Sequence, residues 1–151
     1  MRNSSLFILA SLLVASAGAF EAPAAGAQKE PVRFLAVDVF VNSGEAPLAA
    51  YQFEMIARGG DARIVGVEGG EHPAFSQPPY YDPAALKGGR IIIAAFDTGK
   101  DLPKGRTRVA TIHVREAGAT RPEYSVALTV AATLDGKRIA ATAAVGQGEG
   151  K

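Results

Sequence analysis

Alternation of apolar and polar residues is the dominant pattern of this chain beyond residue 32. In segment 33–42 one of the two alternating sets is apolar from residue 35 onward, with Leu35, Val37, Val39 and Val41. A period of two residues is typical of a β-strand with one buried face. Further segments of this kind follow, separated by Gly, Pro, Asn and Asp turns. They are 48–56, 63–68, 90–96, 107–115, 124–134 and 137–145.

Segment 90–96, Arg-Ile-Ile-Ile-Ala-Ala-Phe, differs because both of its alternating sets are apolar. A strand with one face in water should alternate, so the segment predicts a strand that is covered on both faces. Segment 69–89, directly before it, is rich in proline and aromatic residues. We expect this long loop to fold back as the cover. The two sets are Ile91, Ile93 and Ala95, and Ile92, Ala94 and Phe96.

A single helical turn is predicted inside this loop. Asp82 is a favourable N-cap, Pro83 suits the first helical position, and Gly88-Gly89 ends the turn. Elsewhere in the chain, Asp135-Gly136 is the strongest signal for a hairpin turn. No segment has apolar residues spaced with the period of a long helix. The sequence therefore predicts an all-β chain, a single jelly-roll or immunoglobulin-like β-sandwich of about seven to nine strands with one long proline- and aromatic-rich loop.

The N-terminal segment 1–27 has the three parts of a secretory signal peptide. Arg2 gives a positive start, 6–15 is an apolar run, and small residues follow with Ala-x-Ala sites ending at Ala19 and Ala27. The apolar run is short for a membrane span. We expect cleavage after Ala27, with Ala19 as the alternative site and an uncleaved anchor as the alternative fate. The chain is then exported, to the periplasm or out of the cell.

The remaining chain divides into a linker at 28–32, a β-sandwich domain at 33–146 and a disordered tail at 147–151. Removing the leader takes away Arg2 and Glu21, so 16 Lys and Arg become 15, and 15 Asp and Glu become 14. The net charge stays at +1, without the basic field that a nucleic-acid partner requires. No second apolar run reaches membrane length, so we expect no membrane contact after cleavage.

Several kinds of chemistry lack the residues they need. The chain has no cysteine, which excludes disulfides, thiol chemistry and Cys-based zinc sites. Its histidines are His72 and His113, and neither a Gly-x-Ser-x-Gly nor a His-Glu-x-x-His motif is present. We therefore expect a protein that is not an enzyme. No cofactor is expected either, although loop carboxylates of Asp82, Asp97 and Asp101 leave a structural calcium site as an open alternative.

The aromatic loop holds the candidate binding residues, which are Phe75, Tyr80, Tyr81 and Asp82. Proline stiffens such a loop and lowers the entropy lost on binding, and tyrosine offers a large contact area with a polar tip. Two interpretations stay open. The rings pack over the apolar strand and complete the core, or they face solvent and bind a ligand. In an intermediate version Phe75 anchors the loop while Tyr80 and Tyr81 face outward.

Five strand motifs follow one another in a recognisable order. They are Val-Asp-Val-Phe-Val at 37–41, Ala-Ala-Tyr-Gln-Phe-Glu-Met at 49–55, Ile-Val-Gly-Val-Glu-Gly-Gly at 64–70, segment 90–96, and Val-Ala-Thr-Ile-His-Val at 109–114. This order resembles a cohesin domain and its carbohydrate-binding-module relatives, over most of residues 33–132. The resemblance implies a jelly-roll sandwich that recognises a protein, since cohesins bind dockerins through a flat sheet face and its loops.

Together these expectations describe an exported recognition module without enzymatic activity. Its expected partner is a protein, either dockerin-like or from the cell envelope, bound through a sheet face or the 72–90 loop. The alternative partner is a polysaccharide whose sugar rings stack on the exposed tyrosines Tyr80 and Tyr81.

Overall fold

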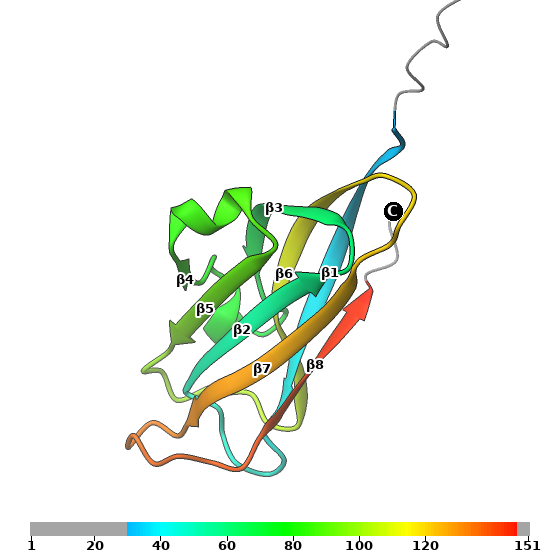
Figure 1. Ribbon diagram of the computed structural model, residues 1–151. Coiled ribbons are helices and arrows are strands. Elements are labelled where there is room, and N and C mark those ends of the chain that lie inside the picture. Colours follow the sequence, from blue (N-terminus) through cyan, green and yellow to red (C-terminus); the bar gives the residue numbers. More distant parts are fainter. Residues whose placement is uncertain (1–29, 148–151) are drawn as a thin grey trace, which may run out of the picture.

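The computed structural model describes residues 30–147, which form a two-layer β-sandwich (Figure 1). One sheet has the strand order β3-β6-β1-β8 and the other β4-β5-β2-β7, each with four strands. All strand pairs are antiparallel. The strands are β1 (Val32–Asn42), β2 (Ala50–Arg58), β3 (Asp61–Gly69), β4 (Tyr80–Tyr81), β5 (Arg90–Phe96), β6 (Arg106–Ala117), β7 (Glu123–Ala132) and β8 (Thr142–Gln147).

The predicted all-β sandwich is confirmed, and each predicted strand has a counterpart among the eight. Strand β5 has the predicted bounds, and β4 is an additional strand of two residues inside the loop. The predicted signal peptide lies outside the described residues, as do residues 28–29 of the predicted linker and 148–151 of the predicted tail.

The core fills the space between the two sheets. Val37, Val39 and Val41 of β1 and Phe53 and Met55 of β2 alternate with more exposed neighbours and are fully buried. Their side chains all point inward because successive residues of a strand point to opposite faces. Each such buried side chain contributes about 1.5–3 kcal/mol of hydrophobic stabilisation, which supports the fold in a chain without cysteine.

Tyr51 links the two sheets through the centre of this core. Its ring stacks on Phe53 with centroids 5.8 Å apart, and its hydroxyl donates a hydrogen bond of 2.9 Å to the carbonyl of Val109 on the opposite sheet. A buried phenol requires such an acceptor. Burial also raises the pKa of the Tyr51 hydroxyl well above its ordinary value.

The helical segments among residues 30–147 are two short 3-10 turns, η1 (Pro73–Phe75) and η2 (Pro83–Lys87). The second is the predicted helical turn, and Asp82 is its N-cap, with Oδ1 accepting the Ala84 N–H at 2.9 Å. Within the same residues, no helix has the length and apolar character needed to cross a membrane.

The prediction for the last hairpin is correct in its turn and wrong in its strand. The turn forms, with Gly136 at a φ of 78° and its N–H donating to the Thr133 carbonyl. Beyond it, a single bridge joins Ala132 and Arg138, and the chain then crosses to the other sheet. Strand β8 begins five residues later than the predicted 137, because its partner is β1 of the opposite sheet rather than β7.

The prediction that β5 is covered on both faces is also wrong. Ile91 and Ile93 are buried, but Ile92 is 43% exposed and Phe96 is 63% exposed. The loop pairs with the edge of β5 as strand β4 and sends Phe75 between the sheets, so it does not cross the outer face. The second apolar set of this strand therefore faces solvent.

Candidate functional site

Two glycines fix the start of the aromatic loop against the neighbouring backbone. A Cβ atom on Gly70 would lie 2.3 Å from the carbonyl oxygen of Arg108, and one on Gly69 would lie 2.3 Å from that of Ser76. Only glycine permits such a close approach. The Glu71 N–H adds a hydrogen bond of 3.0 Å to the same Arg108 carbonyl, so the loop begins from a fixed position on β6.

Phe75 anchors the middle of the loop in the core. Its side chain is 2% exposed, and its ring meets Tyr51 edge-on, with centroids 5.0 Å apart and planes at 75°. His72 Nδ1 accepts the Ala74 N–H at 3.2 Å and so caps the η1 turn that carries Phe75. Phe75, one of the four residues predicted as binding residues, therefore positions the loop and is too buried to contact a ligand.

Strand β4 directs its two tyrosines to opposite faces of the sheet. Tyr80 pairs with Ala94 and Tyr81 with Ile93 at the edge of β5. Tyr80 is 70% exposed on the outer face, whereas Tyr81 is half-buried and packs against the core. The anchoring role of Phe75 and the outward position of Tyr80 match the intermediate version of the loop prediction. The expected outward position of Tyr81 is met only in part.

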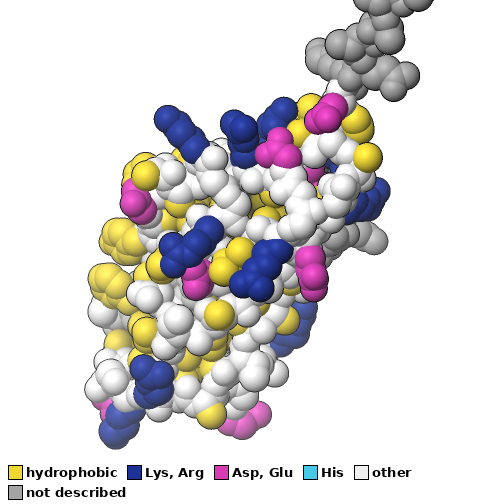
Figure 2. Space-filling model, viewed as in Figure 1, with side chains coloured by type: hydrophobic (Ala, Val, Ile, Leu, Met, Phe, Trp, Pro, Cys, Tyr) yellow, Lys and Arg dark blue, Asp and Glu magenta, His cyan; other side chains and the backbone are white. Residues whose placement is uncertain are grey.

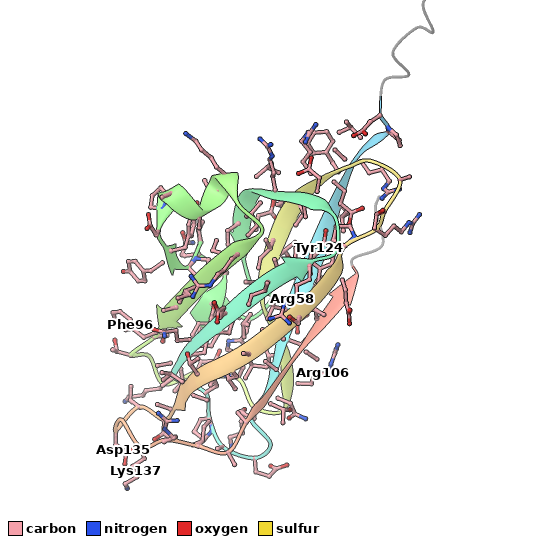
Figure 3. The ribbon with its side chains drawn as sticks, in the orientation of Figure 1. Arg58, Phe96, Arg106, Tyr124, Asp135 and Lys137 are labelled. Carbon is pink, nitrogen blue, oxygen red and sulfur yellow. The ribbon has the colours of Figure 1, made fainter. Side chains whose placement is uncertain are left out.

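Tyr80 belongs to an exposed apolar cluster that we call the aromatic edge, made of Tyr80, Ile92, Ala94 and Phe96. The rings of Tyr80 and Phe96 are nearly parallel, with centroids 6.2 Å apart and planes at 11°. Figure 2 shows hydrophobic side chains along the margin that carries β4 and β5, whereas charged side chains cross the middle of this face. Phe96 projects outward at that margin (Figure 3).

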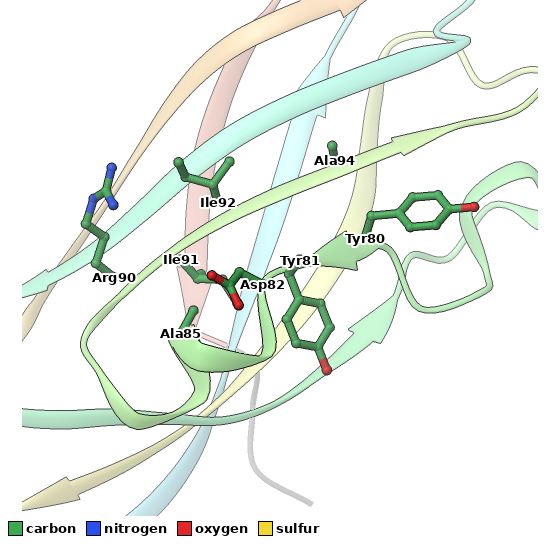
Figure 4. Close-up of a pocket in the computed structure, with 8 residues that line it drawn as sticks. All are labelled: Tyr80, Tyr81, Asp82, Ala85, Arg90, Ile91, Ile92 and Ala94. Carbon is green, nitrogen blue, oxygen red and sulfur yellow. The ribbon is translucent and has the colours of Figure 1, made fainter.

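A groove of about 540 Å³ lies beside the aromatic edge, between β4, η2 and β5 (Figure 4). Three of the four sequence-predicted site residues line it, namely the consecutive residues Tyr80, Tyr81 and Asp82. Figure 4 shows the two tyrosine rings diverging from β4. The groove is lined by Tyr80, Tyr81, Asp82, Ala85, Arg90, Ile91, Ile92 and Ala94.

The two charged residues of the groove differ in their partners. Arg90 Nε pairs with Oε1 of Glu54 on the adjacent strand β2. Asp82 is in none of the ion pairs formed by residues 30–147, and the one hydrogen bond of its side chain among them is the η2 cap. The groove therefore combines a neutralised guanidinium with a carboxylate that has no cationic partner in the described part of the chain.

The three carboxylates considered for calcium have separate local contacts. Asp97 Oδ1 accepts the Gly99 N–H at 2.6 Å, Asp101 lies 3.9 Å from His72 Nε2, and Asp82 caps η2. Across the described range 30–147, no group of three or more His, Cys, Asp or Glu side chains is arranged to hold a metal ion.

A buried ionic cluster away from the groove has no signal in the sequence. Glu116 is 5% exposed and accepts hydrogen bonds from Arg33 Nη2 at 2.8 Å and from the Tyr124 hydroxyl at 2.7 Å. Burial, followed by the hydrogen bond to Glu116, raises the pKa of Tyr124. The buried Glu116 carboxylate thus has hydrogen-bond donors from Arg33 and Tyr124, and these bonds connect β6 to β1 and to β7.

Sequence reasoning did not assign Ile92, Ala94, Phe96 or Arg90 to the site. The signal for the first three is the second apolar set of segment 90–96, from which the sequence predicts a covered strand. That set instead faces solvent on the same side as Tyr80, and Arg90 lines the same groove.

In comparisons with known proteins, the chain matches no protein-family model, no curated protein and no solved structure. The resemblance to cohesins therefore stays a prediction from the strand motifs.

Proposed function

We propose that this chain is an exported, non-enzymatic recognition module that binds a protein partner through the aromatic edge. The observation that carries the proposal is the stacked pair of Tyr80 and Phe96, which are 70% and 63% exposed. Aromatic side chains are enriched in protein interfaces and supply much of the binding energy.

Polar residues border this apolar cluster along the side of β2. On strand β2, Gln52 lies opposite Ala94 and Glu54 lies opposite Ile92. Apolar clusters bordered by polar residues mark interaction sites on soluble proteins. The arrangement therefore favours a partner that buries the aromatic edge at the centre of its contact.

The binding surface is held in place before any partner arrives. Phe75 is buried in the core, Gly70 packs on the β6 backbone, and Tyr80 pairs with β5. Ordering a flexible loop costs free energy on association, and a surface built on strands avoids most of that cost. Rigidity thus supports recognition as the function of this region.

Carbohydrate binding is the second candidate function. The observation in its favour is the near-parallel orientation of the Tyr80 and Phe96 rings, at 11°, because stacked sugar rings need exposed aromatic faces. Stacking of sugar rings on both tyrosines also requires Tyr81 on the surface. Tyr81 is half-buried and packs against the core, which favours a protein partner.

The test compares variants of the exported chain, residues 28–151, in quantitative capture from envelope and secreted fractions. The site variant is Tyr80→Thr/Phe96→Thr, which keeps residues that suit strands. The matched control is Phe34→Thr, since Phe34 is 73% exposed on β1 of the other sheet. We expect one partner protein to be retained by the wild type and the control and reduced about 30-fold in the site variant, equivalent to about 2 kcal/mol.

Equal capture of that partner by all three proteins would contradict the proposal. Retention of a polysaccharide instead, lost only in the Tyr80→Thr/Phe96→Thr variant, would establish the carbohydrate alternative at the same surface.

A further inference from the structure

The carboxylate of Asp82 is placed at the groove by the turn that it caps. Its Oδ1 accepts the Ala84 N–H at 2.9 Å, and the second oxygen has no hydrogen-bond partner among residues 30–147. The cap fixes the side chain of Asp82 at the groove. Little conformational entropy of this side chain is then lost when a ligand binds. A cation in the groove can therefore pair with the second carboxylate oxygen of Asp82, which the cap does not use.

The local charge favours a positive ligand. Arg90 is engaged by Glu54, which leaves Asp82 as the uncompensated charge of the groove. The lining residues Asp82 and Arg90 together with Glu54 carry a net charge of −1, and the exposed Lys87 at the last position of η2 does not line the groove. Charge complementarity of this kind selects partners and excludes those of like charge.

The walls of the groove suit a long side chain with a charged end. Ala85 and Ile92 are apolar and can contact a methylene stem, as Lys and Arg stems do on apolar surfaces. The rings of Tyr80 and Tyr81 border the same space, and cations are attracted to the faces of aromatic rings.

The edge of β5 beside the groove also offers backbone groups to a polypeptide. The pairs Asp97 N–H to Ala49 O and Ala57 N–H to Gly89 O show that odd-numbered residues of this segment bond to β2. In an antiparallel ladder the even-numbered residues then point to the other side. On that side β4 reaches only Ala94 and Ile93, and no described strand pairs with Ile92 there.

The η2 turn explains why this pairing stops. The Asp82 carbonyl accepts the Ala85 N–H at 2.9 Å, so the chain turns away from β5 after Tyr81. The space left next to Ile92 is part of the groove. A partner segment that enters it meets backbone as well as side chains.

We infer that the groove receives an arginine or lysine side chain from an extended segment of the partner protein, with Asp82 as its counter-ion and the Ile92 peptide group as a contact for the partner backbone. This inference rests on the proposed recognition function and specifies the charge of the partner. The groove acts as the anchor pocket next to the aromatic edge.

The test variant is Asp82→Asn, which removes the charge and keeps a side-chain oxygen for the η2 cap. Its matched control is Asp97→Asn, since Asp97 Oδ1 accepts a backbone N–H two residues ahead in the same manner. The probe is N-acetyl-arginine methylamide, with the uncharged citrulline analogue as the ligand control. Binding is followed by amide chemical shifts of the isotope-labelled protein.

We expect the arginine probe to shift the amides of Asp82, Arg90 and Ile92. Its affinity should fall at least about threefold in Asp82→Asn and stay unchanged in Asp97→Asn, in keeping with the size of an exposed ion pair. The citrulline analogue should bind more weakly than the arginine probe, and added salt should reduce this difference.

The inference fails if the groove amides do not shift with the arginine probe, or if Asp82→Asn and the citrulline analogue change nothing. Shifts of these amides by a neutral oligosaccharide in place of the arginine probe would also overturn it. If the captured partner is lost with Tyr80→Thr/Phe96→Thr but kept with Asp82→Asn, the cation pocket is wrong and the recognition function stands. If neither variant affects capture, the proposed function fails as well.

Discussion

The rings of Tyr80 and Phe96 lie nearly parallel, with centroids 6.2 Å apart, although both side chains remain largely exposed. Tyr80 comes from the aromatic loop and Phe96 from the end of the strand that the loop precedes. Because the pair lies outside the core, its contribution to folding should be small.

Phe75 should matter far more for stability than the exposed aromatic pair. Phe75→Ala removes a buried ring beside Tyr51 and is expected to lower the free energy of unfolding by about 3–5 kcal/mol. Tyr80→Thr/Phe96→Thr loses an exposed stack and should cost about 0.5–1.5 kcal/mol. Urea unfolding followed by circular dichroism measures both values, and similar costs for the two changes would disprove the assignment of Phe75 as the anchor.

Gly70 should be intolerant of a side chain. A Cβ atom would lie 2.3 Å from the Arg108 carbonyl oxygen and 2.8 Å from the Val109 Cα, and these backbone atoms cannot move independently. Gly70→Ala is therefore expected to lower the free energy of unfolding by about 1–3 kcal/mol. The measurement is again chemical denaturation at constant pH.

The control for this prediction is Gly88→Ala at the end of η2. Gly88 has an extended backbone with φ −121° and ψ 179°, and the nearest atom to an added Cβ lies 3.9 Å away. We expect a change within about 0.5 kcal/mol. Equal effects of the two alanine substitutions would show that the loop is not packed on β6 as described.

Stability should decline at alkaline pH through Tyr51. Burial raises the pKa of its hydroxyl, so the native state keeps the proton where the unfolded chain has lost it. The contribution is complete below the unfolded pKa of about 10 and is lost above it, because the unfolded state then binds fewer protons. The expected decline from this group is about 1.4 kcal/mol per pH unit.

The Tyr51→Phe variant isolates this effect. At neutral pH it should be less stable than the wild type by about 1–3 kcal/mol, because the Val109 carbonyl loses its hydrogen-bond donor. Above about pH 10 the difference should shrink, since phenylalanine has no proton to lose. Curves of unfolding free energy against pH that stay parallel for the two proteins would refute the prediction.

Much of the strand framework could be predicted from short-range patterns. Strand β5 has the predicted bounds because seven consecutive residues suit a strand and glycines end the segment before it. The η2 turn was predicted from Asp82 and Pro83 because capping depends on neighbouring residues alone.

The site could be predicted only in part, because it depends on contacts between distant segments. The exposure of Ile92 and Phe96 depends on the path of the aromatic loop. That path cannot be predicted from the apolar residues on the two faces of β5. Strand β4 has two residues, too few to show a period. The Arg33–Glu116 pair joins positions 83 residues apart, so no local pattern reveals it.

Site-specific photo-crosslinking in cells tests the central claim most directly. The full-length chain would carry benzoylphenylalanine in place of Tyr80, or in place of Phe34 as a control of similar exposure on the other sheet. The account predicts a crosslinked partner protein from position 80 and none from position 34. The same crosslinked protein at both positions, or none at position 80, would contradict recognition through the aromatic edge.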